Sequence, residues 1–345
     1  MDSELVKKTL RRKLANLGAQ SVARADCVRL FAGRADGRDG LLIDRFGSLY
    51  VAIDYARSSK AETHTELIAS THKLTELLRD VCGDIHVIAK VRSGNEDADS
   101  FTCACLTPVQ ATALPIVGTE RGLRFEIGID PAHDFGVFLD AAKARQHVRS
   151  IAKDKCVLNL FSYTAAFGVA AAVGGAESVT NVDPNRDYLA WGLRNAALNG
   201  VHFRVLPDTA QVFLRKHLRR LGRASSSASP SPRPFDLVIV DPPAFGVGRG
   251  RERLVRLLWP EIFSALRTMQ PRDLVILCND KYFRERTRFE DLVRKELGAA
   301  YAFRRLGTCL NSAELESSTP PALDWSPSVE DPHYMEPVVL AGTLR

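Results

Sequence analysis

From residue 157 onward, short apolar runs alternate with segments in which apolar residues recur every three or four positions. The short runs indicate strands, and the longer segments of helical period indicate helices. The expected strands are 157–161, 178–182, 203–206, 237–240 and 274–277, and the expected helices are 167–173, 186–199, 209–221, 254–269 and 288–297. Strands that are apolar along their whole length are buried on both faces. The pattern therefore predicts an α/β domain with a parallel sheet between two layers of helices.

The chain before residue 116 has a different pattern. Residues 1–26 predict one basic helix, which contains Lys7, Lys8, Arg11, Arg12 and Lys13. Apolar runs broken by glycine and aspartate follow, and they predict strands at 28–31, 40–47, 49–53 and 85–92 and a helix at 61–79. We expect a smaller N-terminal α+β domain at 27–115. A second domain at 116–345 would open with a strand pair from Gly122 and a helix at 140–151.

The composition bounds the class of protein and its location. The 345 residues are 45% hydrophobic, enough to fill the cores of about two domains. No apolar stretch approaches the roughly 18 residues of a membrane span, and the first residues lack the apolar run of a secretory signal. These features predict a cytoplasmic protein without a membrane partner. The basic N-terminal helix has a second interpretation as an organelle-targeting segment, although Asp2 and Glu4 count against it.

Cysteines and charges change this picture in two ways. The seven cysteines are scattered, without paired C-x-x-C spacing, so we expect reduced thiols and no bound metal. The net charge of +6 suits a polyanionic partner. Cations gather at Arg215, Lys216, Arg219, Arg220 and Arg223, and again at 249–256. A solvated helix face explains the first of these groups as well as a nucleic acid does. The oligomeric state has no signature in the sequence.

A candidate cofactor site follows the expected strand at 157–161. This strand leads directly into Ser162-Tyr163-Thr164-Ala165 and a helix, and ligands of doubly wound sheets bind at such a junction. Asp183 ends the next strand, where a carboxylate accepts the ribose hydroxyls of a nucleoside cofactor; the alternative is an aspartate that caps the helix after Pro184. Asp208, after the third strand, is placed to reach an adenine amino group or to form a turn. The absence of G-x-G-x-x-G argues against a dehydrogenase.

A second candidate site is Asp241-Pro242-Pro243-Ala244-Phe245, directly after the apolar run 235–240. The two prolines fix the backbone where the strand ends. A planar base can stack on this rigid surface and on Phe245 while the Asp241 carboxylate meets its polar edge. The alternative is a strand that is merely terminated by proline.

Together these segments resemble class I S-adenosylmethionine-dependent methyltransferases, and more closely the bacterial large-subunit (23S) ribosomal RNA methyltransferases that modify cytosine C5 or guanine N7. The resemblance covers residues 27–345, and its most specific parts are 157–164 and 241–245. It implies a Rossmann-like class I methyltransferase domain, S-adenosylmethionine as cofactor and RNA, in particular ribosomal RNA, as partner. The cofactor contacts that it implies are Phe138, Asp140, Asn159, Phe161, Ser162, Tyr163, Asp183, Asp208 and Asp241. The catalytic residues that it implies are Asp241, Pro242, Pro243, Phe245 and Cys278.

The sequence also departs from the family that it resembles. Ala165 stands where the family usually has a glycine. The PUA domain of the cytosine-C5 enzymes and the THUMP domain of the guanine-N7 enzymes have no counterpart here. The way in which RNA is selected is therefore not implied by the resemblance.

The motif Leu277-Cys278-Asn279-Asp280-Lys281 bears on the methylated atom. Methylation of a pyrimidine C5 needs a thiolate that adds to C6, and Cys278 follows a strand close to the candidate site. The cytosine enzymes place their cysteine a position or two later, and Asn279-Asp280-Lys281 is similar to the Asn-Asn-Lys of the guanine-N7 branch. We favour N7 over C5; the other interpretation of Cys278 is an inert core thiol.

The expected function is therefore methylation of a base in ribosomal RNA, with the N-terminal domain helping to hold the RNA. Two alternatives remain open. One is a methyltransferase for a small molecule or a protein, since the fold does not dictate the acceptor. The other is a non-catalytic RNA-binding relative, in which Ala165 has weakened cofactor binding.

Overall fold

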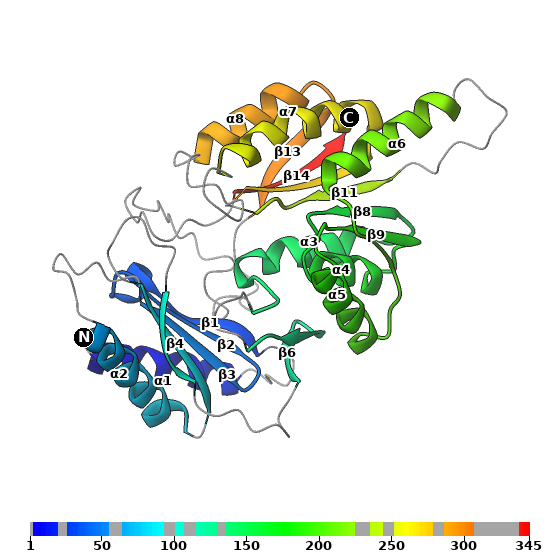
Figure 1. Cartoon of the computed structure of the whole chain (residues 1–345). Helices are drawn as coiled ribbons and strands as arrows, with labels where there is room; N and C mark the ends of the chain where they lie inside the picture. The colour runs from blue at the N-terminus through cyan, green and yellow to red at the C-terminus, as the bar shows by residue number, and fades with distance from the viewer. Residues whose placement is uncertain are drawn as a thin grey trace. The chain divides into compact units, whose positions relative to one another are not determined.

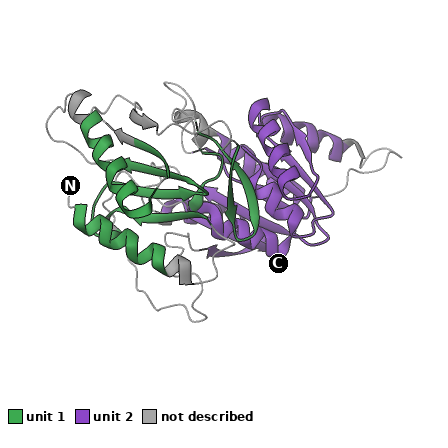
Figure 2. Cartoon of the chain, turned by 90° about the horizontal axis from the view of Figure 1, so that it is seen from below, with its two compact units in different colours: residues 1–139, 309–334 green, residues 140–308, 335–345 purple. Residues whose placement is uncertain are grey.

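The computed structural model describes residues 3–19, 26–54, 64–83, 85–92, 101–106, 115–129, 135–224, 235–243, 252–278, 286–306 and 338–345. The chain forms two compact units (Figure 2). The first consists of Met1–Leu139 with Cys309–Tyr334, and the second of Asp140–Thr308 with Met335–Arg345. Among the helices that the structure describes, none combines the length and the apolar composition of a membrane span.

The first unit contains a five-stranded sheet in the order β1-β2-β3-β4-β5. Its elements are α1 (Ser3–Ala19), β1 (Cys27–Ala32), η1 (Gly33–Asp36), β2 (Leu41–Phe46), β3 (Leu49–Asp54), α2 (His64–Cys82), β4 (His86–Arg92) and β5 (Phe101–Leu106). The helices pack on one face, where Leu10 of α1 and Leu78 of α2 are fully buried against the strands. The α+β arrangement is the expected one, and β5 adds a strand to it.

A hairpin of β6 (Ile116–Glu120) and β7 (Leu123–Ile127) completes the first unit. We expected this pair to begin at Gly122, but the turn itself lies at Arg121 and Gly122, whose positive φ angles of 49° and 81° suit a two-residue hairpin. The backbone N–H of Asp26 donates to the carbonyl of Thr119 at 2.8 Å. This contact joins the hairpin to the residue before β1, and the first unit extends to Leu139. The domain limit at 116 stays a prediction.

The second unit contains a seven-stranded sheet in the order β10-β9-β8-β11-β12-β14-β13. The strands are β8 (Cys156–Leu160), β9 (Ser178–Val182), β10 (Arg204–Leu206), β11 (Leu237–Val240), β12 (Asp273–Cys278), β13 (Tyr301–Leu306) and β14 (Val338–Leu344). The first five are parallel, as expected. Strands β13 and β14 were not expected. β14 lies antiparallel between β12 and β13, so its place depends on pairing with distant parts of the chain.

Two layers of helices cover this sheet (Figure 1). After η3 (Leu139–Ala141), the helices are α3 (Ala142–Ile151), α4 (Ala166–Val173), α5 (Arg186–Leu198), α6 (Ala210–Ala224), α7 (Glu252–Met269) and α8 (Arg286–Leu297). Leu158 and Leu160 pack in the cluster formed with α6, α7 and α8, whereas Val157 packs with α3 and α4. Alternate strand residues are thus buried on opposite faces, which explains the continuous apolar runs of the sequence.

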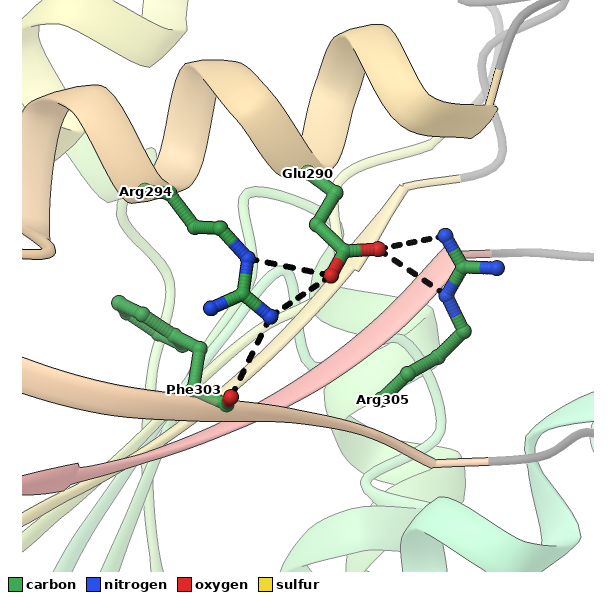
Figure 3. A network of polar contacts seen from close by, with 4 residues as sticks. All are labelled: Glu290, Arg294, Phe303 and Arg305. Atoms are coloured by element: carbon green, nitrogen blue, oxygen red, sulfur yellow. Dashed lines mark hydrogen bonds and ion pairs between the residues drawn. The ribbon is translucent and has the colours of Figure 1, made fainter.

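Glu290 links α8 to β13 (Figure 3). Its Oε1 accepts from Nε and Nη2 of Arg294 at 3.1 and 2.7 Å, and its Oε2 accepts from Nε and Nη2 of Arg305. Partial burial raises the pKa of Glu290, but the hydrogen bonds and charges of the two arginines outweigh it, and the net pKa lies below the usual value. Charge-assisted pairs of this kind are stronger than neutral hydrogen bonds.

We expect Glu290→Gln to lower the free energy of unfolding by about 1 kcal/mol at neutral pH, because both arginines are partly exposed. A lowered pKa in the folded state stabilises above the unfolded pKa of about 4.3 and loses this effect as the pH falls through the folded value. Urea unfolding at neutral pH and near pH 3 should therefore show the difference shrinking in acid. Glu296→Gln removes one ion pair of the same helix and should cost less. An equal cost at both pH values would contradict the assignment.

Candidate active site

The register of the parallel strands brings the ends of four strands to one edge of the sheet. Leu160 of β8 is paired with Val182 of β9 and with Val240 of β11, and Val182 is paired with Leu206 of β10. The segments that follow these strands therefore begin side by side. They contain Phe161, Asp183, Asp208 and Asp241, the residues that the sequence singles out.

The loop after β8 has an unusual backbone. Phe161, Tyr163 and Ala165 have φ angles of 57°, 49° and 59°, all in the left-handed region. For a residue other than glycine this conformation costs roughly 1–2 kcal/mol. Residues 161–165 therefore keep their shape only if neighbouring elements hold them.

Asp183, the residue directly after β9, holds this loop. Its Oδ2 accepts from the backbone N–H of Tyr163, and its Oδ1 accepts from that of Asn185, both at 2.9 Å. Burial raises the pKa of Asp183, against the lowering effect of these two bonds. Asn185, rather than Asp183, caps α5, since its side chain accepts from the N–H groups of Asp187 and Tyr188. Asp183 is thus a structural anchor at the position expected for ribose recognition.

Helix α5 holds the same loop from the other side. The Nδ2 of Asn195, a buried residue, donates to the carbonyl of Thr164 at 3.0 Å. The ring of Tyr163 meets that of Tyr188 edge to face, with centroids 4.6 Å apart. A Cβ at Gly192 would lie 2.9 Å from the Cβ of Ala165. The loop and the helix therefore approach each other so closely that position 192 has little room for a side chain.

This close approach shows how the fold accommodates Ala165, where the sequence resemblance led us to expect glycine. Ala165 is fully buried, and its methyl group lies against Gly192 of α5. Sequence reasoning did not single out Gly192, Asn185 or Asn195. A glycine inside a helix costs about 1 kcal/mol relative to alanine and so indicates a packing constraint. That signal was available for Gly192, whereas the partner of Asn195 required the fold.

Asn159 lies below the loop, within β8. It is buried, and its Nδ2 donates to Oδ1 of Asn181 on β9 at 2.8 Å. Asn181 in turn fills the space beside Gly168 of α4, where a Cβ would collide with its amide. The side chain of Asn159 therefore supports α4 from inside the sheet. A direct cofactor contact by Asn159 stays a prediction.

The residues at this edge fit a nucleoside cofactor. The Oγ of Ser162 is buried and has no hydrogen-bond partner among the described residues. The carboxylate of Asp183 has about four lone-pair sites, of which the backbone uses two. Both groups can therefore form hydrogen bonds with the hydroxyl groups of a ribose or with the amino group of an amino-acid moiety. Within the described ranges, no group of three or more His, Cys, Asp or Glu residues is arranged to hold a metal ion.

The other expected cofactor residues are placed less directly. Asp208 lies after β10, and its Oδ2 accepts from Nζ of Lys216 at 2.8 Å. Phe138 belongs to the first unit, where it is 46% exposed. Asp140 begins the second unit and lies close enough to Asp241 to affect its ionisation. The cofactor contacts of these residues stay predictions.

Asp241 ionises near neutral pH. Burial and, to a smaller extent, the negative charge of Asp140 raise the pKa of Asp241 to about 7. The positive charge of Arg145 acts in the opposite direction. Pro242 is buried and Pro243 is exposed, so the second proline presents its ring to solvent. Phe245 lies outside the described residues, as do residues 279–281.

Cys278 lies at the end of β12, where its side chain is 4% exposed. It packs in the apolar cluster that β11, β12 and β14 form with α6, α7 and α8. A structural cysteine buried in apolar surroundings is generally inert as a nucleophile. The interpretation of Cys278 as a core thiol accounts for this placement.

A family model of S-adenosylmethionine-dependent methyltransferases matches residues 86–258, half of the chain. The chain belongs to this family. The cofactor of the methyltransferase is therefore S-adenosylmethionine, and the edge formed by β8, β9 and β11 is its candidate binding site.

The names of several curated relatives describe methyltransferases of ribosomal RNA. Ribosomal RNA large subunit methyltransferase I of Klebsiella pneumoniae is 33% identical over 222 residues, which cover 64% of this chain and 51% of the relative. Ribosomal RNA large subunit methyltransferase K/L of Shewanella woodyi is 30% identical over 217 residues, which cover 61% of this chain and 28% of the relative. The chain matches about half of the first relative's length and less of the second's.

Solved structures match almost the whole methyltransferase. A methyltransferase complexed with SAH aligns with a TM-score of 0.72 at 19% identity over 99% of this chain and 82% of that chain. A SAM-dependent methyltransferase from Agrobacterium tumefaciens aligns with a TM-score of 0.58 at 19% identity over 94% of this chain and 91% of that chain. At this identity the likeness concerns the fold, and it confirms the Rossmann-like class I methyltransferase fold.

We expect Gly192→Ala to weaken S-adenosylmethionine binding, because the new methyl group would push Ala165 and the loop aside. Overpacking of this kind costs about 1–3 kcal/mol, offset in part by the helix propensity of alanine. Adding Ala165→Gly should restore both affinity and stability. Calorimetric titration and thermal unfolding of the two single variants and the double variant measure the coupling.

Gly222→Ala in α6 is the matched control, since no atom lies within 4 Å of its Cβ position. It should leave cofactor affinity unchanged. Additive effects of the changes at 165 and 192 would refute the proposed contact.

We expect Asp183→Ala to weaken cofactor binding about 100-fold, since each lost hydrogen bond to a charged group costs about 1.5–3 kcal/mol. Because the same carboxylate holds Tyr163 and Asn185, the free energy of unfolding should also fall, by about 1–3 kcal/mol. Calorimetry and urea unfolding measure the two effects. Asp187→Ala, an exposed change in the first turn of α5, is the control; unchanged affinity in the Asp183 variant would mean that Asp183 has no part in binding.

Proposed function

We propose that this protein methylates a base of RNA, most specifically a guanine N7 of ribosomal RNA. The observation that carries the proposal is the placement of Asp241-Pro242-Pro243 beside the cofactor loop, through the pairing of Val240 with Leu160. A rigid, partly exposed proline next to a carboxylate favours a planar acceptor with a polar edge. The names of the curated relatives support ribosomal RNA as the source of that acceptor.

S-adenosylmethionine supplies a methyl group on a positively charged sulfur, which is open to in-line attack by a nucleophile. The residues of the protein orient and hold the two partners. Above about pH 7, the ionised Asp241 carboxylate accepts hydrogen bonds from donors on the edge of the base. Guanine offers such donors on its Watson–Crick edge, so its N7 stays available. Carboxylates near the sulfonium also favour it electrostatically.

The placement of Cys278 supports N7 over C5. Addition of a thiolate to C6 of cytosine requires a reactive sulfur that reaches the base. The sulfur of Cys278 instead packs in an apolar cluster between the sheet and its helices. The N7 atom of guanine is itself nucleophilic, so methylation there requires no cysteine.

We also propose that the protein acts in the cytoplasm and that its N-terminal domain helps to hold RNA.

Methyl transfer from tritiated S-adenosylmethionine to total RNA from cells that lack the gene tests the proposal. Nucleoside analysis of the product should show label in 7-methylguanosine. Label in 5-methylcytidine would support the C5 alternative, and label in no RNA would favour a small-molecule or protein acceptor. A protein that fails to bind S-adenosylmethionine at millimolar concentration would be the non-catalytic relative.

We expect Cys278→Ala to keep the rate of methyl transfer within about threefold of the original, since its side chain packs in the apolar cluster and the proposed attack by N7 needs no thiolate. Its unfolding temperature should fall by a few degrees because a small cavity forms. The initial rate with saturating RNA measures the first effect, and Cys156→Ala, a buried thiol of β8, is the control. Loss of activity in the Cys278 variant alone would indicate covalent catalysis.

A further inference from the structure

Where the burial of α6 residues is described, the exposed side chains of this helix are all positive. Among the described residues of this helix, the exposed side chains are those of Arg215, Lys216, Arg219 and Arg220. We call these four residues the α6 basic face. The opposite side of the helix is buried through Ala210 and Leu214 in the cluster shared with α7.

The arrangement is unfavourable for a helix that is merely solvated. Arg215 and Arg219 are four residues apart, as are Lys216 and Arg220, and like charges at this spacing destabilise a helix by about 0.2–0.5 kcal/mol per pair. Solvated faces usually place acidic residues at such positions. The helix dipole favours cations in the last turn, but Arg215 and Lys216 lie nearer the middle of α6.

Few carboxylates neutralise the α6 basic face. Lys216 pairs with Asp208 at 2.8 Å and Arg215 with Glu261 at 3.4 Å, and both cations keep about half or more of their side-chain surface exposed. Within the described ranges, no ion pair involves Arg219 or Arg220; Nε of Arg219 donates only to the carbonyl of Arg215. Two guanidinium groups are therefore available to an outside anion.

The α6 basic face also starts close to the candidate site. Helix α6 begins two residues after Asp208, which lies at the strand edge that holds Asp183 and Asp241. Lys216 is tied to Asp208 itself. A polyanion that lies on this face is thereby led toward the end of the sheet where methyl transfer is proposed.

We propose that the α6 basic face binds the phosphate backbone of the RNA acceptor. This inference rests on the proposed function. Cations one helical turn apart, about 6 Å, follow a line of phosphates. Guanidinium groups suit phosphate oxygens because they donate in pairs. Contacts to phosphates position a nucleic acid without reading its sequence, so the base itself is selected at the Asp241 segment.

The test is the paired change Arg219→Glu with Arg220→Glu. Each glutamate would lie four residues from a cation, so α6 should remain stable. Binding of a short fluorescein-labelled RNA of mixed sequence is measured by anisotropy at about 50–200 mM potassium chloride, where phosphate contacts dominate. We expect affinity to fall about tenfold, and the slope of log Kd against log salt to fall by about 0.7 for each lost contact with single-stranded RNA. Cofactor affinity should not change.

Two further variants sharpen the result. Arg288→Glu with Lys295→Glu changes the net charge equally at exposed positions of α8 and should bind RNA as the original does. Arg219→Lys with Arg220→Lys preserves the charge and should keep most of the affinity. In methyl transfer, the α6 charge reversal should raise KM for RNA and leave kcat unchanged.

The outcomes separate this inference from the proposed function. If the original protein binds and methylates RNA but the α6 reversal changes neither affinity nor salt slope, the inference is wrong and the function stands. If the original protein neither binds nor methylates RNA, the proposed function itself fails. Loss of binding to vesicles that contain anionic lipid, with RNA binding unchanged, would overturn the assignment to RNA.

Discussion

The candidate active site depends on the left-handed backbone of residues 161–165. A loop that adopts this conformation three times without glycine is unfavourable by itself, so other parts of the fold must hold it. Asp183 binds it from β9 and Asn195 binds it from α5. The loop therefore takes its shape only when the sheet and α5 are both in place. The shape of the candidate cofactor site therefore depends more on the elements that pack around the loop than on the sequence of the loop itself.

Asp183 and Ala165 both lie at the candidate cofactor site and also contribute to the packing of the fold. Asp183 stands where ribose recognition is expected, and it also satisfies backbone N–H groups of the loop and of the start of α5. Ala165 occupies a position where the sequence resemblance led us to expect glycine, and Gly192 of the facing helix leaves room for its methyl group. The total volume at the contact is what the packing constrains.

The charges of the second unit are arranged by sign. Asp183 and Asp241 follow β9 and β11, the two strands that flank β8 at the candidate cofactor site. The α6 basic face carries the opposite sign and suits phosphates. Asp208 and Lys216 join the two regions through an ion pair. Such separation suits a cationic cofactor in one region and the RNA acceptor that we propose in the other.

The sequence by itself determined the parallel sheet, the helices between its strands, and the residues that follow the strand ends. Those features depend on periodicity and spacing within short segments, which local chain geometry controls. Only the tertiary structure decided that β14 lies between β12 and β13, that Gly192 faces Ala165, and that Cys278 points into the core. These outcomes depend on contacts between distant residues and on which face of a strand is covered. No short segment of the sequence determines these distant contacts or the face of a strand that is covered.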